Sequence, residues 1–365
     1  MNRSNLVYDA IVLGAGPAGL AAAIRLARSG AQVQVFERRA LPQQKCCGEF
    51  LHPSAAEEVR RLVGRPPEGA PISRVQILAG PFMREFPISP GAVGAERRAL
   101  SESLIDAAQA CGVMIRTQVS GDVAELSEGR IKVRVGNDLF RAELLVVAEG
   151  ANSFAARKLG FVRSKFKLVY GFSTRLAARL NGAVALAAIE SGYVGLCDLG
   201  LNGLNLAGLL SADAYRRLAP GRPGFGGRLC SEIPAWADLI PADARAALFQ
   251  VPACAAEISA GAKMTAPIFI VGDSAGMSES AFGDGIARAL RQARLMGVAL
   301  EKYQNDPVRA AREYGRLLRR DPHRPNRPLL HFAARLLRAP FLASAALRLA
   351  SPGIRRLVER ATTAA

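Results

Sequence analysis

The sequence alternates short apolar runs with longer stretches in which apolar residues recur at helical spacing. The mostly apolar runs at residues 9–13, 32–36, 144–148 and 268–271 are typical of strands buried in a parallel sheet. The alanine-rich stretch from residue 17 to about residue 30 predicts a helix directly after the first run. Strands that alternate with helices in this way predict an α/β fold.

A different pattern occupies the middle of the chain. Residues 185–189, 192–197 and 204–210 read as strands of a second sheet, and the proline-punctuated residues 212–249 read as a helical cover. We therefore expect a discontinuous Rossmann-type nucleotide-binding domain, interleaved with a mostly antiparallel substrate sheet and followed by a helical C-terminal segment. The predicted bounds are 1–70, 94–160 and 262–305 for the first domain, 71–93 and 161–261 for the substrate domain, and 306–365 for the last segment.

The first apolar run leads into GAGPAG, a G-x-G-x-x-G sequence that opens the predicted helix. In this context Gly14 allows a tight turn, Gly16 lets the backbone approach a pyrophosphate, and Gly19 lets the helix pack closely on the strand. The helix N-terminus offers unpaired N–H groups and a partial positive charge to the phosphates. Glu37 ends the second run, eighteen residues after Gly19, where it can accept hydrogen bonds from a ribose. The pattern predicts a dinucleotide site.

The 365-residue chain carries a net charge of +17, and half of its residues are apolar, so a globular protein with an ample core is expected. The charge fits an ordinary arginine-rich solvated surface. It equally fits contact with an anionic membrane surface or with an acidic, phosphorylated or carrier-linked substrate. Nucleic acid is not expected as a partner, because no basic run is interleaved with aromatic residues.

The six cysteines include no C-x-x-C pair and the three histidines lie far apart, so no metal site is expected. The N-terminus runs into the first strand without a basic-then-apolar signal. We therefore expect a cytoplasmic protein with reduced thiols.

Three more motifs follow the glycine loop along the chain: RRALSESL with Arg97, AEGANSFAARKLG and GDSAGMSESAFGDGI. Together the four motifs resemble those of the FAD-dependent oxidoreductases of the para-hydroxybenzoate hydroxylase and geranylgeranyl reductase superfamily. The resemblance covers nearly the whole chain up to about residue 304, and it implies an oxidoreductase whose cofactor is FAD.

The resemblance also implies a role for each motif. The glycine loop would hold the ADP half of FAD, Arg97 would lie near the pyrophosphate and ribityl chain, and Asp273 would bind a ribityl hydroxyl. Two departures stand out, since Glu149 replaces an aspartate and Ser280 replaces a proline that many relatives carry. The residues implied to bind FAD are Gly14, Gly16, Pro17, Ala18, Gly19, Glu37, Arg38, Cys47, Gly48, Arg97, Glu149, Gly150, Asp273, Gly283, Gly285 and Ile286.

The segment Cys46-Cys47-Gly48-Glu49 resembles the C-G-E segment of the geranylgeranyl reductase branch, which lies beside the flavin. Glu49 and His52 are the candidate catalytic residues, as proton carriers near the ring. The alternative is that both are satisfied loop residues and that the two thiols are small packing residues.

Two reactions compete. We favour an NAD(P)H-dependent monooxygenase that uses O2 to hydroxylate a lipophilic or aromatic secondary metabolite. The alternative is hydride transfer to isolated double bonds of a polyprenyl lipid, but residues 192–196 lack the tryptophan that such reductases carry on a strand. The sole tryptophan is Trp236, so the W-x-W-x-I-P motif of flavin halogenases is missing too. No second G-x-G-x-x-G is present, so NAD(P)H would bind only transiently. A non-catalytic flavin-binding scaffold is a third hypothesis.

The segment from residue 323 to 365 alternates apolar blocks with arginines. Its longest uncharged run, residues 339–347, is far shorter than the ~20 residues of a membrane-spanning helix. An interfacial helical hairpin would make the protein a peripheral membrane protein and favour a lipophilic substrate. A helical cap on the core or a dimer contact is the alternative.

Overall fold

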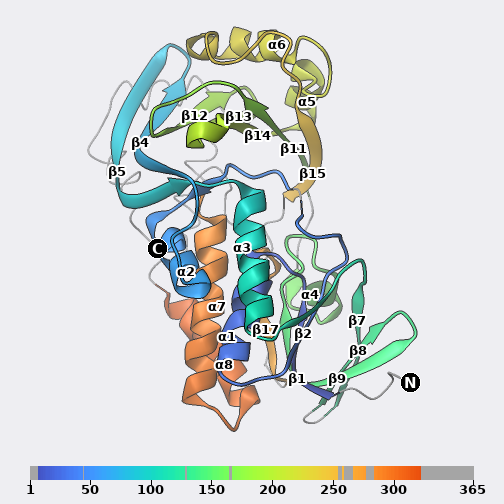
Figure 1. Ribbon diagram of the computed structural model, residues 1–365. Helices are drawn as coiled ribbons and strands as arrows, with labels where there is room; N and C mark the ends of the chain where they lie inside the picture. Colours follow the sequence, from blue (N-terminus) through green and yellow to red (C-terminus); the bar gives the residue numbers. More distant parts are fainter. Residues whose placement is uncertain are drawn as a thin grey trace.

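The computed structural model describes residues 7–43, 45–127, 130–163, 167–253, 257–258, 266–276 and 283–321. Figure 1 shows two large sheets, one above the other. We call them the lower sheet and the upper sheet. Long helices cover the lower sheet, and short helices lie on the outer side of the upper sheet. The predicted fold class, a Rossmann-type α/β domain interleaved with a mostly antiparallel sheet, is confirmed.

The lower sheet has seven strands in the order β6-β2-β1-β9-β8-β7, with β17 paired to β9. The pairs β6–β2, β2–β1, β1–β9 and β9–β17 are parallel, whereas β7 and β8 form an antiparallel extension. The carboxyl ends of the parallel strands therefore meet at one edge. The bounds are β1 Val7–Leu13, β2 Val33–Phe36, β6 Met114–Arg116, β7 Gly121–Ser127, β8 Arg130–Val135, β9 Asp138–Val147 and β17 Ile268–Ile270.

The upper sheet has eight strands in the order β15-β11-β14-β13-β12-β4-β5-β3. All of its pairs are antiparallel except β12–β4. The bounds are β3 Phe50–Leu51, β4 Ala70–Ala79, β5 Phe82–Gly94, β11 Lys167–Leu176, β12 Ala183–Ile189, β13 Gly192–Asp198, β14 Leu204–Leu210 and β15 Ala247–Ala253. A small pair joins β10 (Val162–Arg163) to β16 (Glu257–Ile258).

Apolar side chains from five helices pack on one face of the lower sheet, in a single core cluster that runs from Ala10 to Tyr314. These helices are α1 Pro17–Arg28, α2 Pro53–Val63, α3 Arg97–Ala110, α7 Gly285–Lys302 and α8 Pro307–Arg320. The remaining helices are α4 Phe154–Lys158, α5 Ala212–Leu218 and α6 Phe225–Glu232, with short turns η1 Gly200–Asn202, η2 Pro234–Trp236 and η3 Gly272–Ala275. Within the described part of the chain, no helix has the length and apolar character needed to cross a membrane.

Some elements differ from the sequence predictions. The run expected at residues 144–148 is the second half of a longer strand, β9, and the helical piece expected up to residue 249 gives way to β15. Strand β11 was not predicted, because Gly171 and Ser173 interrupt its apolar pattern with residues that favour turns. Of the C-terminal segment, only α8 and Asp321 lie among the described residues, so the proposed hairpin lies outside them.

Candidate functional site

The glycine loop combines two confined glycines with an open one. A Cβ on Gly14, whose φ is +103°, would lie 2.3 Å from the Ala148 carbonyl oxygen, and one on Gly19 would lie 2.0 Å from the Gly14 carbonyl oxygen. Gly16 differs, because no protein atom lies within 4 Å of a Cβ placed there. Pro17 opens α1 and supplies no N–H. The loop is therefore packed against the protein at Gly14 and Gly19 and open at Gly16. This arrangement suits a pyrophosphate at the N-terminus of α1.

Glu37 fastens this loop to the end of β2. Its buried carboxylate accepts hydrogen bonds from the Ala15 N–H (2.8 Å) and the Arg39 N–H (2.9 Å). Each carboxylate oxygen has a second lone pair, so acceptors remain for a ribose. Arg38 is exposed next to it. The ribose contact stays a prediction.

The loops after β1, β9 and β17 meet at the edge of the lower sheet. The Ser274 hydroxyl accepts a hydrogen bond from the Gly150 N–H (2.9 Å) and lies 3.2 Å from the Gly150 carbonyl oxygen, to which it donates. Gly272 has a φ of +65°, and a Cβ there would lie 2.8 Å from the Cβ of Ala18. These contacts join segments that lie far apart in the sequence, and they bring the glycine loop and the turns around Gly150 and Asp273 to the same edge of the sheet.

Glu149 has a local task at this edge. One of its carboxylate oxygens accepts hydrogen bonds from the Ser153 hydroxyl (2.6 Å) and the Ala155 N–H (2.8 Å), at the start of α4. This carboxylate therefore stabilises the helix N-terminus, where negative charge is favourable. Its part in FAD binding stays a prediction.

Asp273 follows β17 and remains partly available. Arg288 of α7 donates to one of its carboxylate oxygens (3.1 Å), yet the aspartate side chain is 43% exposed. Gly283 lies close to Phe50 of β3, with 3.0 Å between a Cβ placed there and the ring, whereas Gly285 faces open space at the start of α7. The side chain of Ile286, the next residue, packs partly against the core. Asp273 can therefore still bind a polyol, and the start of α7 leaves room for a ligand.

Residues 45–52 form a connecting segment between the two sheets. The Cys46 thiol donates to the Phe172 carbonyl oxygen of β11 (3.3 Å), and Asn205 of β14 donates to the Cys47 carbonyl oxygen (2.8 Å). The Glu49 N–H points at the Cys47 sulfur (3.4 Å), and Gly48 is exposed beside it. The predicted C-G-E segment thus lies directly under the upper sheet.

Glu49 connects three elements. Its backbone has a φ of +57°, and its buried carboxylate accepts from the Arg97 N–H of α3 (2.9 Å) and from the Arg175 guanidinium of β11 (2.8 Å). Burial raises the pKa of this carboxyl, and both donors oppose that shift. The geometry shows a positioning carboxylate between the sheets, and a role as proton carrier stays a prediction.

His52 is the N-cap of α2. Its Nδ1 accepts from the Ser54 N–H at 3.3 Å and lies 3.0 Å from the Ser54 hydroxyl, and the side chain is buried. An Nδ1 that accepts the backbone N–H leaves the ring proton on Nε2. The imidazole therefore has a structural task, and its predicted catalytic role is not tested by this geometry.

The thiols near the connecting segment are held in their protonated form. Burial raises the pKa of Cys46 to about 12, with the neighbouring Cys47 adding to the shift. Burial also raises the pKa of Cys47 and of Cys197 on β13. The Cys197 thiol donates to the Glu49 carbonyl oxygen at 3.5 Å. These sulfurs are neutral weak donors at neutral pH rather than nucleophilic thiolates.

The upper sheet turns one face toward the lower sheet, and we call it the inner face. It carries Arg175, Cys197 and Asn205, whose side chains contact the connecting segment. Side chains alternate between the two faces of a strand, so the strand register places further residues on this inner face. Along β11, β13 and β14 they are Gly171, Ser173, Tyr193, Gly195, Ala207 and Leu209. The outer face holds the core beneath α5 and α6. Along these three strands the inner face is thus lined mainly by small side chains, together with the larger Tyr193 and Leu209.

Sequence reasoning missed several residues of the site. Lys45, Arg175 and Asn205 contact or adjoin the predicted motifs, but no periodicity marked them. Lys45 directly precedes the C-C-G-E segment, and that adjacency was the available signal. Arg175 lies 126 residues from its partner Glu49, and Asn205 lies 158 residues from its partner Cys47. The fold of the upper sheet brings them to the segment, and local sequence does not encode this.

The fold and the site define an FAD-dependent oxidoreductase. The open space before Gly16, the accessible Asp273 and the buried, unpartnered Nε of Arg97 among the described residues fit the phosphate and polyol parts of FAD. Residues 8–195 match the family described as pyridine nucleotide-disulphide oxidoreductase. The chain belongs to this family.

Two relatives match part of the sequence. The menaquinone reductase of Mycolicibacterium smegmatis is 34% identical over 185 residues, which are 47% of this chain and 44% of that protein. Digeranylgeranylglycerophospholipid reductase 1 of Methanopyrus kandleri is 31% identical over 165 residues, 42% of this chain and 43% of that protein. The match spans less than half of the length of either relative.

The fold extends further than the sequence match. The crystal structure of PqsL, a probable FAD-dependent monooxygenase from Pseudomonas aeruginosa, superposes with a TM-score of 0.75 at 17% identity, covering 94% of this chain and 100% of that one. The flavin-dependent brominase Bmp2 gives a TM-score of 0.70 at 16% identity, covering 98% and 93%. At these identities the likeness concerns the fold.

Proposed function

We propose that this oxidoreductase acts on a lipophilic substrate that lies against the inner face of the upper sheet. The observation that carries the proposal is the lining of that face, where Gly171, Gly195 and Ala207 leave room and Leu209 is apolar. Arg175, the charged residue that we place on this face, is already paired with Glu49. An apolar lining with few polar groups is the usual environment of a lipophilic ligand.

We further propose that the reaction is hydride transfer to a double bond of a polyprenyl lipid. FAD supplies a two-electron carrier that can pass hydride to a carbon or react with O2. The two sequence relatives are named menaquinone reductase and digeranylgeranylglycerophospholipid reductase 1, and they are 34% and 31% identical to this chain over the matched segments. Hydride from reduced FAD would add to one carbon of the bond and a proton from solvent to the other, so that the two-electron reduction balances.

The second candidate is the NAD(P)H-dependent monooxygenase of a lipophilic or aromatic metabolite. It is favoured by β13, whose inner face carries Tyr193 and Gly195 and lacks the tryptophan of the polyprenyl reductases. In both candidates NAD(P)H is the proposed reductant, and it would visit the site transiently. A lipophilic substrate also agrees with peripheral membrane contact through residues 322–365, which lie outside the described part of the chain.

The two reactions are separated by their products. The purified full chain with bound FAD would be given NADPH or NADH and a panel of polyprenyl lipids and alkyl phenols, once without O2 and once in air. Double-bond reduction proceeds without O2 and adds two hydrogen atoms to a polyprenyl lipid. Monooxygenation requires O2 and adds one oxygen atom. Turnover of only water-soluble, charged substrates would contradict the apolar site in both versions.

A further inference from the structure

Lys45 begins the connecting segment, and its ammonium lies where the cofactor loops meet. The Nζ is 3.7 Å from a Cβ placed on Gly150, at the end of β9. Its charge also interacts with those of Arg97, Asp273 and Glu37, which come from α3, η3 and the end of β2. The side chain is accessible to water although protein atoms crowd it. Lys45 therefore occupies the middle of the proposed FAD site.

The ammonium has no direct partner in the described part of the chain. Asp273 and Glu37 attract it, but neither carboxylate forms an ion pair with it; Asp273 is paired with Arg288, and Glu37 accepts from backbone N–H groups. Burial lowers the pKa of Lys45, and repulsion from the Arg97 guanidinium lowers it further. An ammonium that lacks a protein anion at this crowded point can bind the anion of a ligand.

Arg97 is in the same situation. Its Nε is buried without a hydrogen-bond partner among the described residues, although its backbone N–H is bound by Glu49. Two cations that repel each other thus lie near Glu37, whose carboxylate binds the glycine loop before α1. The helix end and the two cations all favour negative charge in the same region.

We propose that Lys45 binds the diphosphate of FAD together with Arg97, and that it is a determinant of cofactor affinity. The diphosphate carries two negative charges, which match the two cations, and its ribose and ribityl ends would then extend toward Glu37 and Asp273. This inference rests on FAD binding and is independent of which reaction the enzyme performs.

Lys45 also couples the cofactor to the upper sheet. The next residue, Cys46, is hydrogen-bonded to β11, and Cys47 is hydrogen-bonded to β14. A lysine held by the diphosphate fixes the start of the segment that lies under the inner face. Loss of this anchor would loosen the segment as well as the cofactor.

The test compares Lys45→Gln with Lys45→Arg in the full-length holoprotein. Lys302→Gln is the matched control, because Lys302 lies at the far end of α7 and pairs with Glu313. The dissociation constant of FAD would be measured from the fluorescence of the FAD released on dilution. ADP, which carries the diphosphate without the flavin, would be titrated as a competitor. We expect Lys45→Gln to raise the dissociation constants of FAD and ADP by the same factor of about 10 to 100. Lys45→Arg should leave both constants close to those of the original chain.

Two further readouts decide against a merely structural role. The difference between Lys45→Gln and the original chain should shrink at high salt, since a charge contact is screened, while the circular dichroism spectrum stays unchanged. The proposal is overturned if Lys45→Gln leaves both dissociation constants unchanged. It is equally overturned if Lys45→Gln weakens the binding of FAD but not that of ADP and also shifts the midpoint potential of the flavin. The lysine would then contact the flavin ring rather than the diphosphate.

Discussion

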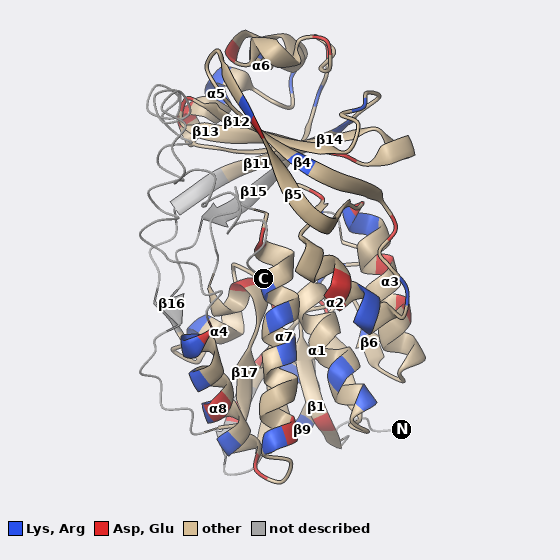
Figure 2. Ribbon diagram, turned by 90° about the vertical axis from the view of Figure 1, so that its left-hand side faces the viewer, with Lys and Arg blue, Asp and Glu red and all other residues tan. Residues whose placement is uncertain are grey.

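Two groups of basic side chains on this molecule differ in how their charge is balanced. One surrounds Glu58 on the outer side of the helical layer, and the other is the pair Lys45 and Arg97 at the cofactor site. Figure 2 shows that lysine and arginine are spread widely over α1, α7 and α8, so basic residues alone do not mark a site. The presence or absence of a built-in anion does distinguish the two groups.

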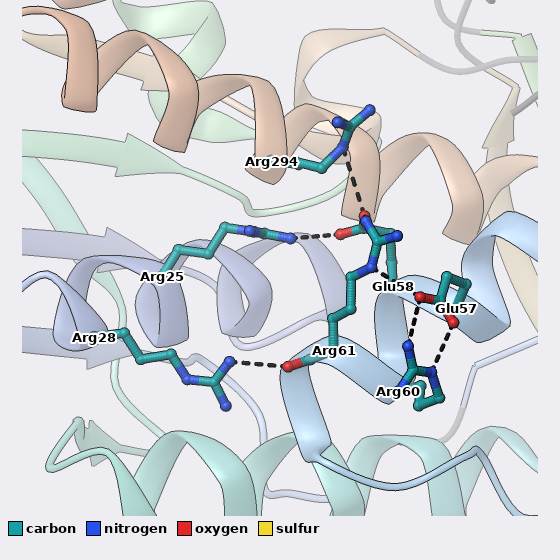
Figure 3. Close-up of polar contacts among 7 residues, drawn as sticks. All are labelled: Arg25, Arg28, Glu57, Glu58, Arg60, Arg61 and Arg294. Carbon is teal, nitrogen blue, oxygen red and sulfur yellow. Dashed lines mark hydrogen bonds and ion pairs between the residues drawn. The ribbon is translucent and has the colours of Figure 1, made fainter.

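Around Glu58 every arginine has an acceptor, as Figure 3 shows. The Glu58 carboxylate, which is 10% exposed, binds Arg25 of α1, Arg61 of its own helix α2 (3.2 Å) and Arg294 of α7 (3.5 Å). Arg28 donates to the carbonyl oxygen of Arg61 (2.9 Å). This group joins three helices, and although the Nε of Arg25 has no partner among the described residues, its guanidinium is paired with Glu58 through another nitrogen, which is the pattern of a structural network.

The cofactor site shows the opposite pattern. Lys45 and Arg97 come from different elements, repel each other, and have no hydrogen-bonded carboxylate between them in the described chain. A cation that is balanced by the protein stabilises the fold, whereas a cation that is left unbalanced stabilises the complex with an anion. Substitutions around Glu58 should therefore change the stability of the fold, whereas substitutions at the cofactor site should change the affinity for the cofactor.

The largest expected effect is on folding. Glu58→Gln removes the shared anion and leaves three arginines facing one another, so we expect a loss of about 3 kcal/mol in the free energy of unfolding. Urea denaturation of the holoprotein measures it. Glu57→Gln is the control, because Glu57 makes only exposed pairs with Arg60 and Arg61, and its effect should be clearly smaller. Equal losses in both variants would remove the distinction between the buried and the exposed carboxylate.

A smaller effect is expected at the cofactor. Asp273→Ala removes a carboxylate that pairs with Arg288 and is still 43% exposed. FAD should bind about tenfold more weakly, since a hydrogen bond to a charged group contributes about 1.5 kcal/mol. Equilibrium dialysis of the flavin measures the change. Full flavin occupancy under these conditions would show that Asp273 serves only its ion pair.

The smallest effect should come from the rim of the Glu58 group. Arg294 is 37% exposed and its contact with Glu58 is 3.5 Å long, so Arg294→Gln should cost less than about 1 kcal/mol. Thermal unfolding in low and high salt measures this contribution, which should vanish as salt screens it. If Arg294→Gln lowered the free energy of unfolding as much as Glu58→Gln, the exposed Arg294 would be as important to the group as the buried Glu58.

The sequence predicts the parts of the site that depend on local order. Gly14, Gly16 and Gly19 follow from their spacing between a strand and a helix, and Asp273 follows from its place after a buried strand. Lys45 and Glu58 were not predicted, because their roles arise from neighbours far along the chain. For Glu58 those neighbours include Arg25 and Arg294, and no repeat or period connects them.

The strands were predictable to the same extent. The second half of β9, residues 144–147, is apolar throughout because its side chains are buried in core clusters on both faces of the sheet, and this leaves a clear local signal. Strand β11 has large residues such as Phe172 on its outer face and Gly171 and Ser173 on its inner face. The small residues of the inner face, where we propose that the substrate lies, are the same residues that hide the strand from sequence analysis.

The order of the strands in the lower sheet has a consequence for synthesis of the chain. β1 is made before β9 and β17, β17 pairs with β9 only after residue 270 has been added, and Gly272 then packs on Ala18. At about 5 to 20 residues per second, the cofactor site stays incomplete for more than about 10 s after its glycine loop has formed. The upper sheet is made within this interval, so it has time to fold before the cofactor can bind.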